Sequence, residues 1–301
     1  MRRAILTLFL AVSALLTGAQ LSLPMKDKSV RFAVIGDSGT GEKPQFDVAK
    51  QMTEVHQAFA FEFTLMLGDN IYGSKSPEDF RRKFQEPYQP LLDQGVKFYA
   101  SLGNHDATNE PAYKPFNMNG KQYYSFRKGN AEFFALDSNY MDPEQVKWLD
   151  GQLAASDATW KICFFHHPLY SDGRTHGPSL DLRKQVEPIL VAHGVNLVLC
   201  GHEHFYERFK PQKGITYIVL GSSGQLRPHD IRPSPDAEKT FDTDRVFLLI
   251  EVAGDQLYFQ TLSRAGETVD SGSLQAPGGK RGAVAPSPSV VNRPLAVGLQ
   301  D

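Results

Sequence analysis

The sequence predicts an α/β fold, and three features of the chain point to it. Short apolar runs typical of strands alternate with amphipathic stretches typical of helices through the first two thirds of the chain. Proline stands at or near the first turn of three of the four predicted helices, where its missing N–H costs no hydrogen bond. From Thr216 onward the apolar runs follow one another without helices, so we expect these later strands to be antiparallel.

The elements are predicted in chain order from these runs. The length of 301 residues and the 41% share of hydrophobic residues suit one large globular domain or two small ones. The predicted strands are Arg31–Ile35, Phe63–Leu67, Lys97–Leu102, Glu132–Leu136, Trp160–Phe165, Asn196–Cys200, Thr216–Leu220, Val246–Val252 and Gln256–Leu262. The predicted helices are Pro44–Phe59, Pro77–Leu92, Pro143–Ala154 and Leu180–Ala192.

The first 20 residues predict a signal peptide. Arg2 and Arg3 precede a nearly unbroken apolar stretch from Ala4 to Leu16, and small residues follow it up to Ala19. The stretch is shorter than the ~20 residues that a membrane span needs, although an uncleaved anchor is the alternative. We therefore expect a secreted or periplasmic protein without stable membrane association after cleavage.

Residues 21–275 form the predicted catalytic domain, and residues 276–301 are rich in Pro, Gly, Ala and Ser without a period. This composition predicts a disordered tail or a linker. The formal net charge is -2 and no long run of Lys or Arg occurs, which argues against nucleic-acid binding. Cys163 and Cys200 each stand in an apolar stretch, and we expect two buried thiols on neighbouring strands rather than a disulfide.

Five predicted strands are each followed at once by residues of metal-ligand type. In open α/β sheets, ligands gather beyond the carboxyl ends of the strands, so five strand ends can converge on one crevice. The glycine before four of the groups lets the backbone turn sharply off the strand. The groups are Gly36-Asp37, Gly68-Asp69-Asn70-Ile71-Tyr72, Gly103-Asn104-His105-Asp106, His166-His167 and Gly201-His202-Glu203-His204.

Each group alone is a weak signal. A Gly-Asp pair after a strand is usually a turn, and a single His-x-His is more often an ordinary surface or core feature. Their joint occurrence at five strand ends predicts a metal site. Imidazole, carboxylate, amide and phenol side chains together suit hard and borderline cations.

These motifs resemble the calcineurin-like metallophosphoesterase superfamily. The tyrosine three residues after Asp69 narrows the resemblance to the purple acid phosphatases of the small single-domain type, over about residues 30–274. The resemblance implies a four-layer α/β/β/α sandwich with two mixed sheets and with metals at the carboxyl ends of the strands. It also implies a monomeric acid phosphatase that acts on small phosphate esters.

The resemblance implies two metals bridged by Asp69. The first, Fe³⁺, would take Asp37, Asp69, Tyr72 and His204, and the second, a divalent Fe²⁺, Zn²⁺ or Mn²⁺, would take Asp69, Asn104, His166 and His202. The two carboxylates and the phenolate suit the trivalent ion, and the two neutral imidazoles and the amide suit the divalent ion. Many relatives in the wider superfamily carry a histidine where this chain has Gly39, and Tyr72 is the natural replacement.

A metal-bound hydroxide is expected to attack the phosphate directly, because no activated serine or cysteine accompanies the motifs. His105 is placed to hold a phosphate oxygen or to protonate the leaving group, and Asp106 could orient it. His176 is the other candidate acid. Asn104 is also expected to contact substrate, whereas His167 is either a substrate contact or a wall of the pocket.

Three other functions remain open at this stage. A phosphodiesterase or nucleotide pyrophosphatase would use the same metals. A redox-active iron protein would use the Fe³⁺/Fe²⁺ pair, and a non-catalytic binder would lack a ligand or His105. No ligand is missing, which favours an enzyme.

Overall fold

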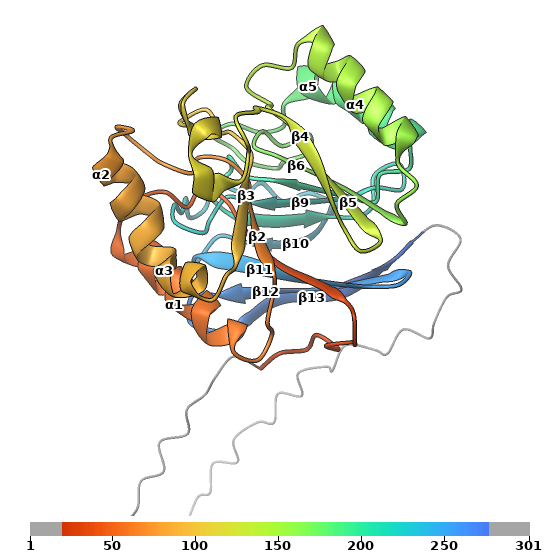
Figure 1. The fold of residues 1–301 in the computed structure, drawn as a ribbon. Helices are drawn as coiled ribbons and strands as arrows, with labels where there is room; N and C mark the ends of the chain where they lie inside the picture. The colour runs from red at the N-terminus through yellow and green to blue at the C-terminus, as the bar shows by residue number, and fades with distance from the viewer. Residues whose placement is uncertain (1–19, 277–301) are drawn as a thin grey trace, which may run out of the picture.

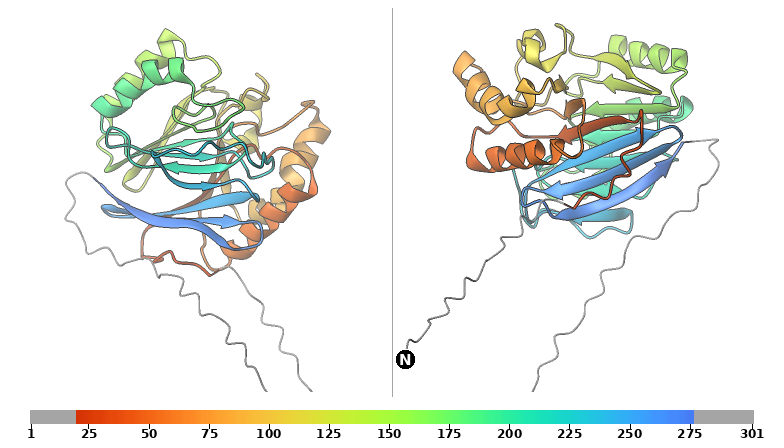
Figure 2. Two further views of the ribbon diagram at one scale, coloured as in Figure 1. Left: turned by 180° about the vertical axis from the view of Figure 1, so that it is seen from behind. Right: turned by 60° about the horizontal axis from the view of Figure 1, so that its bottom comes forward.

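The computed structural model describes residues 20–276 of the chain (Figure 1). The predicted signal peptide up to residue 19 and the predicted tail from residue 277 lie outside the described residues. Two mixed sheets face each other, and helices cover their outer sides (Figures 1 and 2). The predicted α/β/β/α sandwich is confirmed. Within residues 20–276, none of the helices has the length and apolarity of a membrane span.

The first sheet has six strands in the order β13-β12-β11-β1-β2-β3. β1, β2 and β3 are parallel, and β11, β12 and β13 continue the sheet antiparallel from β1. The polar edge strand β13 was not predicted. The bounds are β1 Val30–Ile35, β2 Phe63–Met66, β3 Lys97–Ala100, β11 Val246–Ala253, β12 Gln256–Ser263 and β13 Thr268–Gln275.

The second sheet has seven strands in the order β10-β8-β9-β7-β6-β5-β4. β5, β6, β7 and β9 are parallel, whereas β4, β8 and β10 each pair antiparallel. None of these three antiparallel strands was predicted. The bounds are β4 Tyr124–Lys128, β5 Ala131–Ala135, β6 Trp160–Phe165, β7 Leu197–Cys200, β8 Tyr206–Phe209, β9 Thr216–Leu220 and β10 Ala237–Phe241.

The prediction of antiparallel pairing from Thr216 onward is correct for β11 and β12, and for β9 it is correct on one side only. β8 returns from the end of β7 and leads into β9, which lies between β7 and β8. β9 is therefore antiparallel to β8 and parallel to β7.

Helices α1 to α3 cover the first sheet, and α4 and α5 cover the second (Figure 1). The helix predicted over Pro77–Leu92 is divided, because a π-helical turn at Arg81–Gln85 separates α2 from α3. The bounds are α1 Lys43–His56, α2 Pro77–Phe80, α3 Glu86–Asp93, α4 Pro143–Ala155 and α5 Leu180–Ala192, with 3₁₀ turns at Glu110–Ala112 and Lys114–Phe116.

The central strands of the second sheet are buried on both faces, as β6 illustrates. Ile162 and Phe164 pack into the core between the sheets, whereas Cys163 and Phe165 pack into the core under α4 and α5. This follows from the two-residue period of a strand, and it explains the continuous apolar runs of the central strands. Cys163 and Cys200 are buried free thiols on the neighbouring strands β6 and β7, so that prediction is confirmed.

Candidate metal centre

Strands from both sheets end at the same edge of the sandwich, and the predicted metal-ligand residues meet there. Asp37 follows β1, Asp69 follows β2 and His202 follows β7. All three have left-handed backbone conformations, with φ of 51°, 52° and 70°. This conformation costs a non-glycine residue about 1–3 kcal/mol, so the surrounding structure must hold it in place. One such contact is the His202 N–H, which donates to Asp37 Oδ2 at 2.8 Å.

The glycines beside these residues serve mainly to leave room. We expected them to turn the backbone, and Gly68 does so with φ of +86°. At Gly103, however, a Cβ atom would lie 2.2 Å from Asp69 Oδ1, and at Gly201 it would lie 2.4 Å from Asp37 Oδ2. At these two positions the absence of a side chain lets the carboxylates approach the neighbouring strand end.

The first group of donors contains Asp37, Tyr72 and His204. Tyr72 Oη lies 3.2 Å from Asp37 Oδ1 and 3.3 Å from His204 Nε2. His204 Nε2 lies 3.4 Å from Asp37 Oδ1. Ligands bound at about 2.1 Å to one cation are separated by similar distances. These three residues therefore fit the predicted first metal site.

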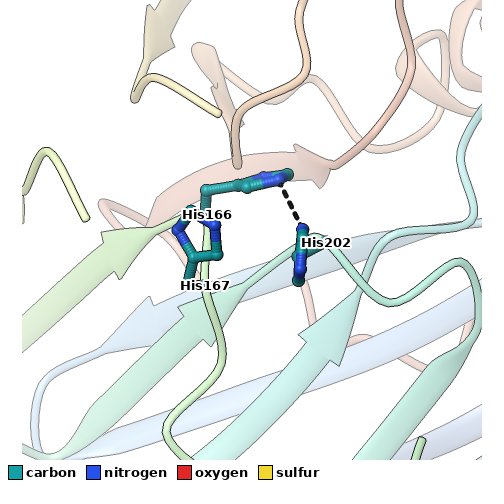
Figure 3. Close-up of side chains that lie close together, drawn as sticks. All are labelled: His166, His167 and His202. Carbon is teal, nitrogen blue, oxygen red and sulfur yellow. Dashed lines mark hydrogen bonds between the residues drawn. The ribbon is translucent and has the colours of Figure 1, made fainter. Parts of the chain in front are cut away.

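The second group surrounds His166 Nε2. This atom lies 2.9 Å from Asn104 Oδ1, 3.1 Å from His202 Nδ1 and 3.5 Å from Asp69 Oδ1. Figure 3 shows the His166–His202 contact beside the ring of His167. His166 Nδ1 donates to the Leu67 carbonyl at 2.9 Å, which leaves a lone pair on Nε2. The Nε2 lone pair and the two oxygens thus face a common point, where a cation relieves their repulsion.

Burial decides the charge of these groups. Burial, and then the neighbouring carboxylate of Asp69, raises the pKa of Asp37 well above its usual range. Burial and the other histidines lower the pKa of His202 to about 2, and burial and Arg227 lower that of His204 to about 4. Neutral imidazoles are the form that binds metal ions. Burial and Asp37 raise the pKa of the Tyr72 phenol, so a strongly charged cation is needed to hold it as phenolate.

Three further histidines border the two groups. The His105 ring packs at 4.9 Å from the Tyr72 ring, and its backbone N–H donates to Asp69 Oδ1 at 2.9 Å. The His176 ring stacks on the His202 ring at 4.3 Å. The His167 ring lies 4.5 Å from the His202 ring, and its Nδ1 contacts Ser138 Oγ at 3.0 Å. All three predicted histidines therefore lie beside the candidate metal ligands.

Asp106 lies close to the site but has other partners than expected. Its carboxylate accepts from the backbone N–H groups of Gly103, Asn70 and Ile71 and from the Asn70 side chain. In the part of the chain that the structure describes, no hydrogen bond joins it to the His105 ring. Asp106 thus ties the loop after β3 to the loop after β2, which holds Asn104 and Asp69 at a fixed separation.

Sequence reasoning missed two supporting residues. Glu203, which is fully buried and stands between the two histidines of its motif, accepts from the Gly177 N–H at 2.6 Å and faces His176 Nδ1 at 3.6 Å. Lys83 donates to the Tyr72 carbonyl at 2.5 Å and pairs with Asp79 at 2.6 Å. Glu203 was visible inside the His-Glu-His motif. Nothing in the sequence marks Lys83, which reaches Tyr72 from the π-helical turn.

Residues 30–206 match the family described as calcineurin-like phosphoesterase, and the chain belongs to it. The match covers all the strand ends that carry the candidate ligands. As the family and the two donor groups indicate, the chain is a metal-dependent phosphoester hydrolase.

Among curated proteins, tartrate-resistant acid phosphatase type 5 of Mus musculus is 26% identical over 66% of this chain and 74% of its own length. The purple acid phosphatase PPD1 from Lupinus luteus seeds has the same fold, with a TM-score of 0.70 at 17% identity over 82% of this chain and 54% of its own. GAP50, titled the anchor in the inner membrane complex of Plasmodium, also has a TM-score of 0.70, at 20% identity over 82% of this chain and 89% of its own. The fold therefore accommodates different functions, and the activity must be argued from the site.

Proposed function

We propose that the chain is an acid phosphatase that hydrolyses phosphate monoesters with two metal ions. The observation that carries the proposal is the pair of donor groups around Asp37 and His166, which supply every ligand type that the resemblance requires. Fe³⁺ suits the group with Tyr72, and a divalent Fe²⁺, Zn²⁺ or Mn²⁺ suits the group with two imidazoles. The similarity to named acid phosphatases supports a monoester as substrate.

The two donor groups would hold the cations, whose charge would offset that of the phosphate and would lower the pKa of the attacking water. The side chains then position the ester and handle the proton. His105 and His176 lie beside different ligands, Tyr72 and His202, and are placed to bind the phosphate oxygens. In the reaction, a bond forms between the water oxygen and phosphorus, and the ester P–O bond breaks. The proton lost by water ends on the leaving oxygen, and one of these two imidazoles carries it.

Asn104 and His167 complete the proposed substrate contacts. Asn104 Oδ1 faces the His166 ring, which leaves its amide N–H₂ to donate to a phosphate oxygen. His167 is fixed through Ser138, so its other ring nitrogen is free for substrate. Asp106 supports the site by holding the loops after β2 and β3 together. We further propose a monomeric protein exported to the periplasm or the medium.

The test compares p-nitrophenyl phosphate with bis(p-nitrophenyl) phosphate from pH 5 to 8, with iron and zinc supplied during expression. We expect the monoester to be preferred. His105→Ala should lower kcat about 10²-fold while both metals stay bound, since one acid–base or phosphate contact is lost. His193→Ala is the control, because His193 follows α5 at the opposite edge of the sheet and its ring pairs with exposed Asp150. Preference for the diester, or full turnover in His105→Ala, would contradict the proposal.

A further inference from the structure

A cavity of about 520 Å³ opens directly beside the metal centre. It is lined on the metal side by Asn104, which belongs to the second donor group, and by His167, which borders that group. Its outer end is lined by Gln122 and Tyr140. A phosphate bound among the ligands does not need this space. The cavity is therefore available to the rest of the substrate.

The wall of this cavity is held in place by Asn139. Its amide donates to the Leu102 and Gly103 carbonyls at 3.3 and 3.2 Å and to Asp137 Oδ1 at 3.0 Å. These bonds join the loop after β3 to the loop after β5. Tyr140, next in the chain, is 74% exposed, so its ring lies at the rim without packing against the core. The cavity thus has a fixed polar wall and an aromatic ring at its mouth.

The cavity lining offers acidic and amide side chains and, within residues 20–276, no Lys or Arg. Burial raises the pKa of both acidic residues, Asp106 and Asp137. A second anionic group on a substrate would find no cation here and would lie near two carboxyl groups. A neutral hydroxyl group would find the amides of Gln122 and Asn139. A cationic or ring-shaped group would find the face of Tyr140.

We propose that this cavity receives the leaving group and selects phosphate monoesters whose alcohol or phenol is neutral or cationic over those with a further anionic group. The proposal rests on the phosphatase function above and narrows it to a substrate class. Its physical basis is the position of the cavity beside Asn104 and His167 and the absence of a lining cation. Charge at a few ångströms changes specificity by about tenfold when the site is partly open to water.

The experiment measures kcat/KM of the metal-loaded protein for three esters of similar alcohols: phosphocholine, glycerol 1-phosphate and 3-phosphoglycerate. The leaving groups are cationic, neutral and anionic. We expect 3-phosphoglycerate to be at least about tenfold poorer than the other two. Gln122→Lys places a cation at the outer end of the cavity. It should raise the ratio of 3-phosphoglycerate to glycerol 1-phosphate about fivefold or more.

The control is Gln57→Lys, which makes the same charge change outside the cavity. Gln57 is exposed after the end of α1, and α1 runs back from the metal edge to the opposite edge of the sheet. The ratio should stay at its wild-type value in this variant. An unchanged ratio in Gln122→Lys, or a preference of the wild-type protein for 3-phosphoglycerate, would overturn this inference and leave the proposed function standing. Failure to hydrolyse any ester, p-nitrophenyl phosphate included, with both metals bound would overturn the proposed function itself.

Discussion

Replacing Gly201 by alanine tests whether the tight approach of the two sheets sets the metal-binding geometry. A Cβ atom at this position would lie 2.4 Å from Asp37 Oδ2, 2.9 Å from the Leu67 carbonyl oxygen and 3.3 Å from His166 Nδ1. Asp37 is a ligand of the first donor group, and His166 is the centre of the second. The Leu67 carbonyl fixes the His166 ring. One methyl group therefore disturbs both groups at once.

The size of the effect follows from these distances. Ordinary contact begins at 3.4 Å, so Asp37 Oδ2 must move by about 1 Å from its 2.4 Å position. A displacement of ~1 Å at a reacting centre costs about 10²-fold in rate. Overpacking of a closed site also costs about 1–3 kcal/mol of stability. We therefore expect Gly201→Ala to lose about 10²-fold in kcat/KM and to bind both metals more weakly.

The assay combines metal content after gel filtration, kcat/KM for p-nitrophenyl phosphate and urea unfolding. Gly151→Ala is the matched control, because no atom lies within 4 Å of its Cβ position in α4. That variant should keep full activity and gain about 0.5–1 kcal/mol from the better helix propensity of alanine. If Gly201→Ala holds both metals and stays within about threefold of wild-type kcat/KM, the steric reasoning is refuted.

Three further predictions concern charge and ligation. Asp270→Asn should lower the free energy of unfolding by about 2 kcal/mol in urea titration, because Arg208 loses its bidentate partner in a largely buried pair between β8 and β13; a change below about 0.5 kcal/mol would contradict this. Burial raises the pKa of Glu207 from 4.5 to about 9, so the folded state keeps this proton where the unfolded state has lost it, and stability falls as pH rises between those values. Glu207→Gln should remove that part of the fall in urea midpoints between pH 5 and 9, and identical pH profiles for the two proteins would show that Glu207 is ionised in the fold. Tyr72→Phe should abolish the visible absorption of the iron-loaded protein, and a persisting band would mean that the phenol is not a ligand.

The site could be predicted because the candidate ligand residues follow the strands closely in the sequence. Asp37, Asp69, Asn104, His166 and His202 follow parallel strands directly or within a few residues, and parallel strands bring their carboxyl ends to one edge. A local pattern thus determined a long-range arrangement. The same logic did not extend to Asp106, whose bonding partners depend on how two loops pack together. It also did not extend to Lys83, whose contact with Tyr72 depends on a π-helical turn.

The central strands of both sheets were predicted, whereas three of the four edge strands and the interior strand β8 were missed. β7 is wholly apolar and β6 is apolar except for Lys161, and both were found. β10 alternates half-buried and exposed residues, and β13 consists mostly of polar residues. Both lie at the outer edges of the sheets, so no apolar run marks them. β9 was found, but its direction was not. β8 reverses the chain after β7, so β9 runs parallel to β7, and β8 could not be recognised from periodicity.

The carboxylate ligands come from the first sheet and the histidine ligands from the second, and this division has a consequence for the order of events in biosynthesis. Asp37 and His202 are 165 residues apart in the sequence, and they meet only when the two sheets have packed face to face. A growing or partly folded chain therefore holds two incomplete sets of donors, and we expect each to bind a cation more weakly than the complete site. We therefore expect metal loading to follow the assembly of the sandwich, so that bound ions would link its two halves after folding and would not be a nucleus around which the chain folds.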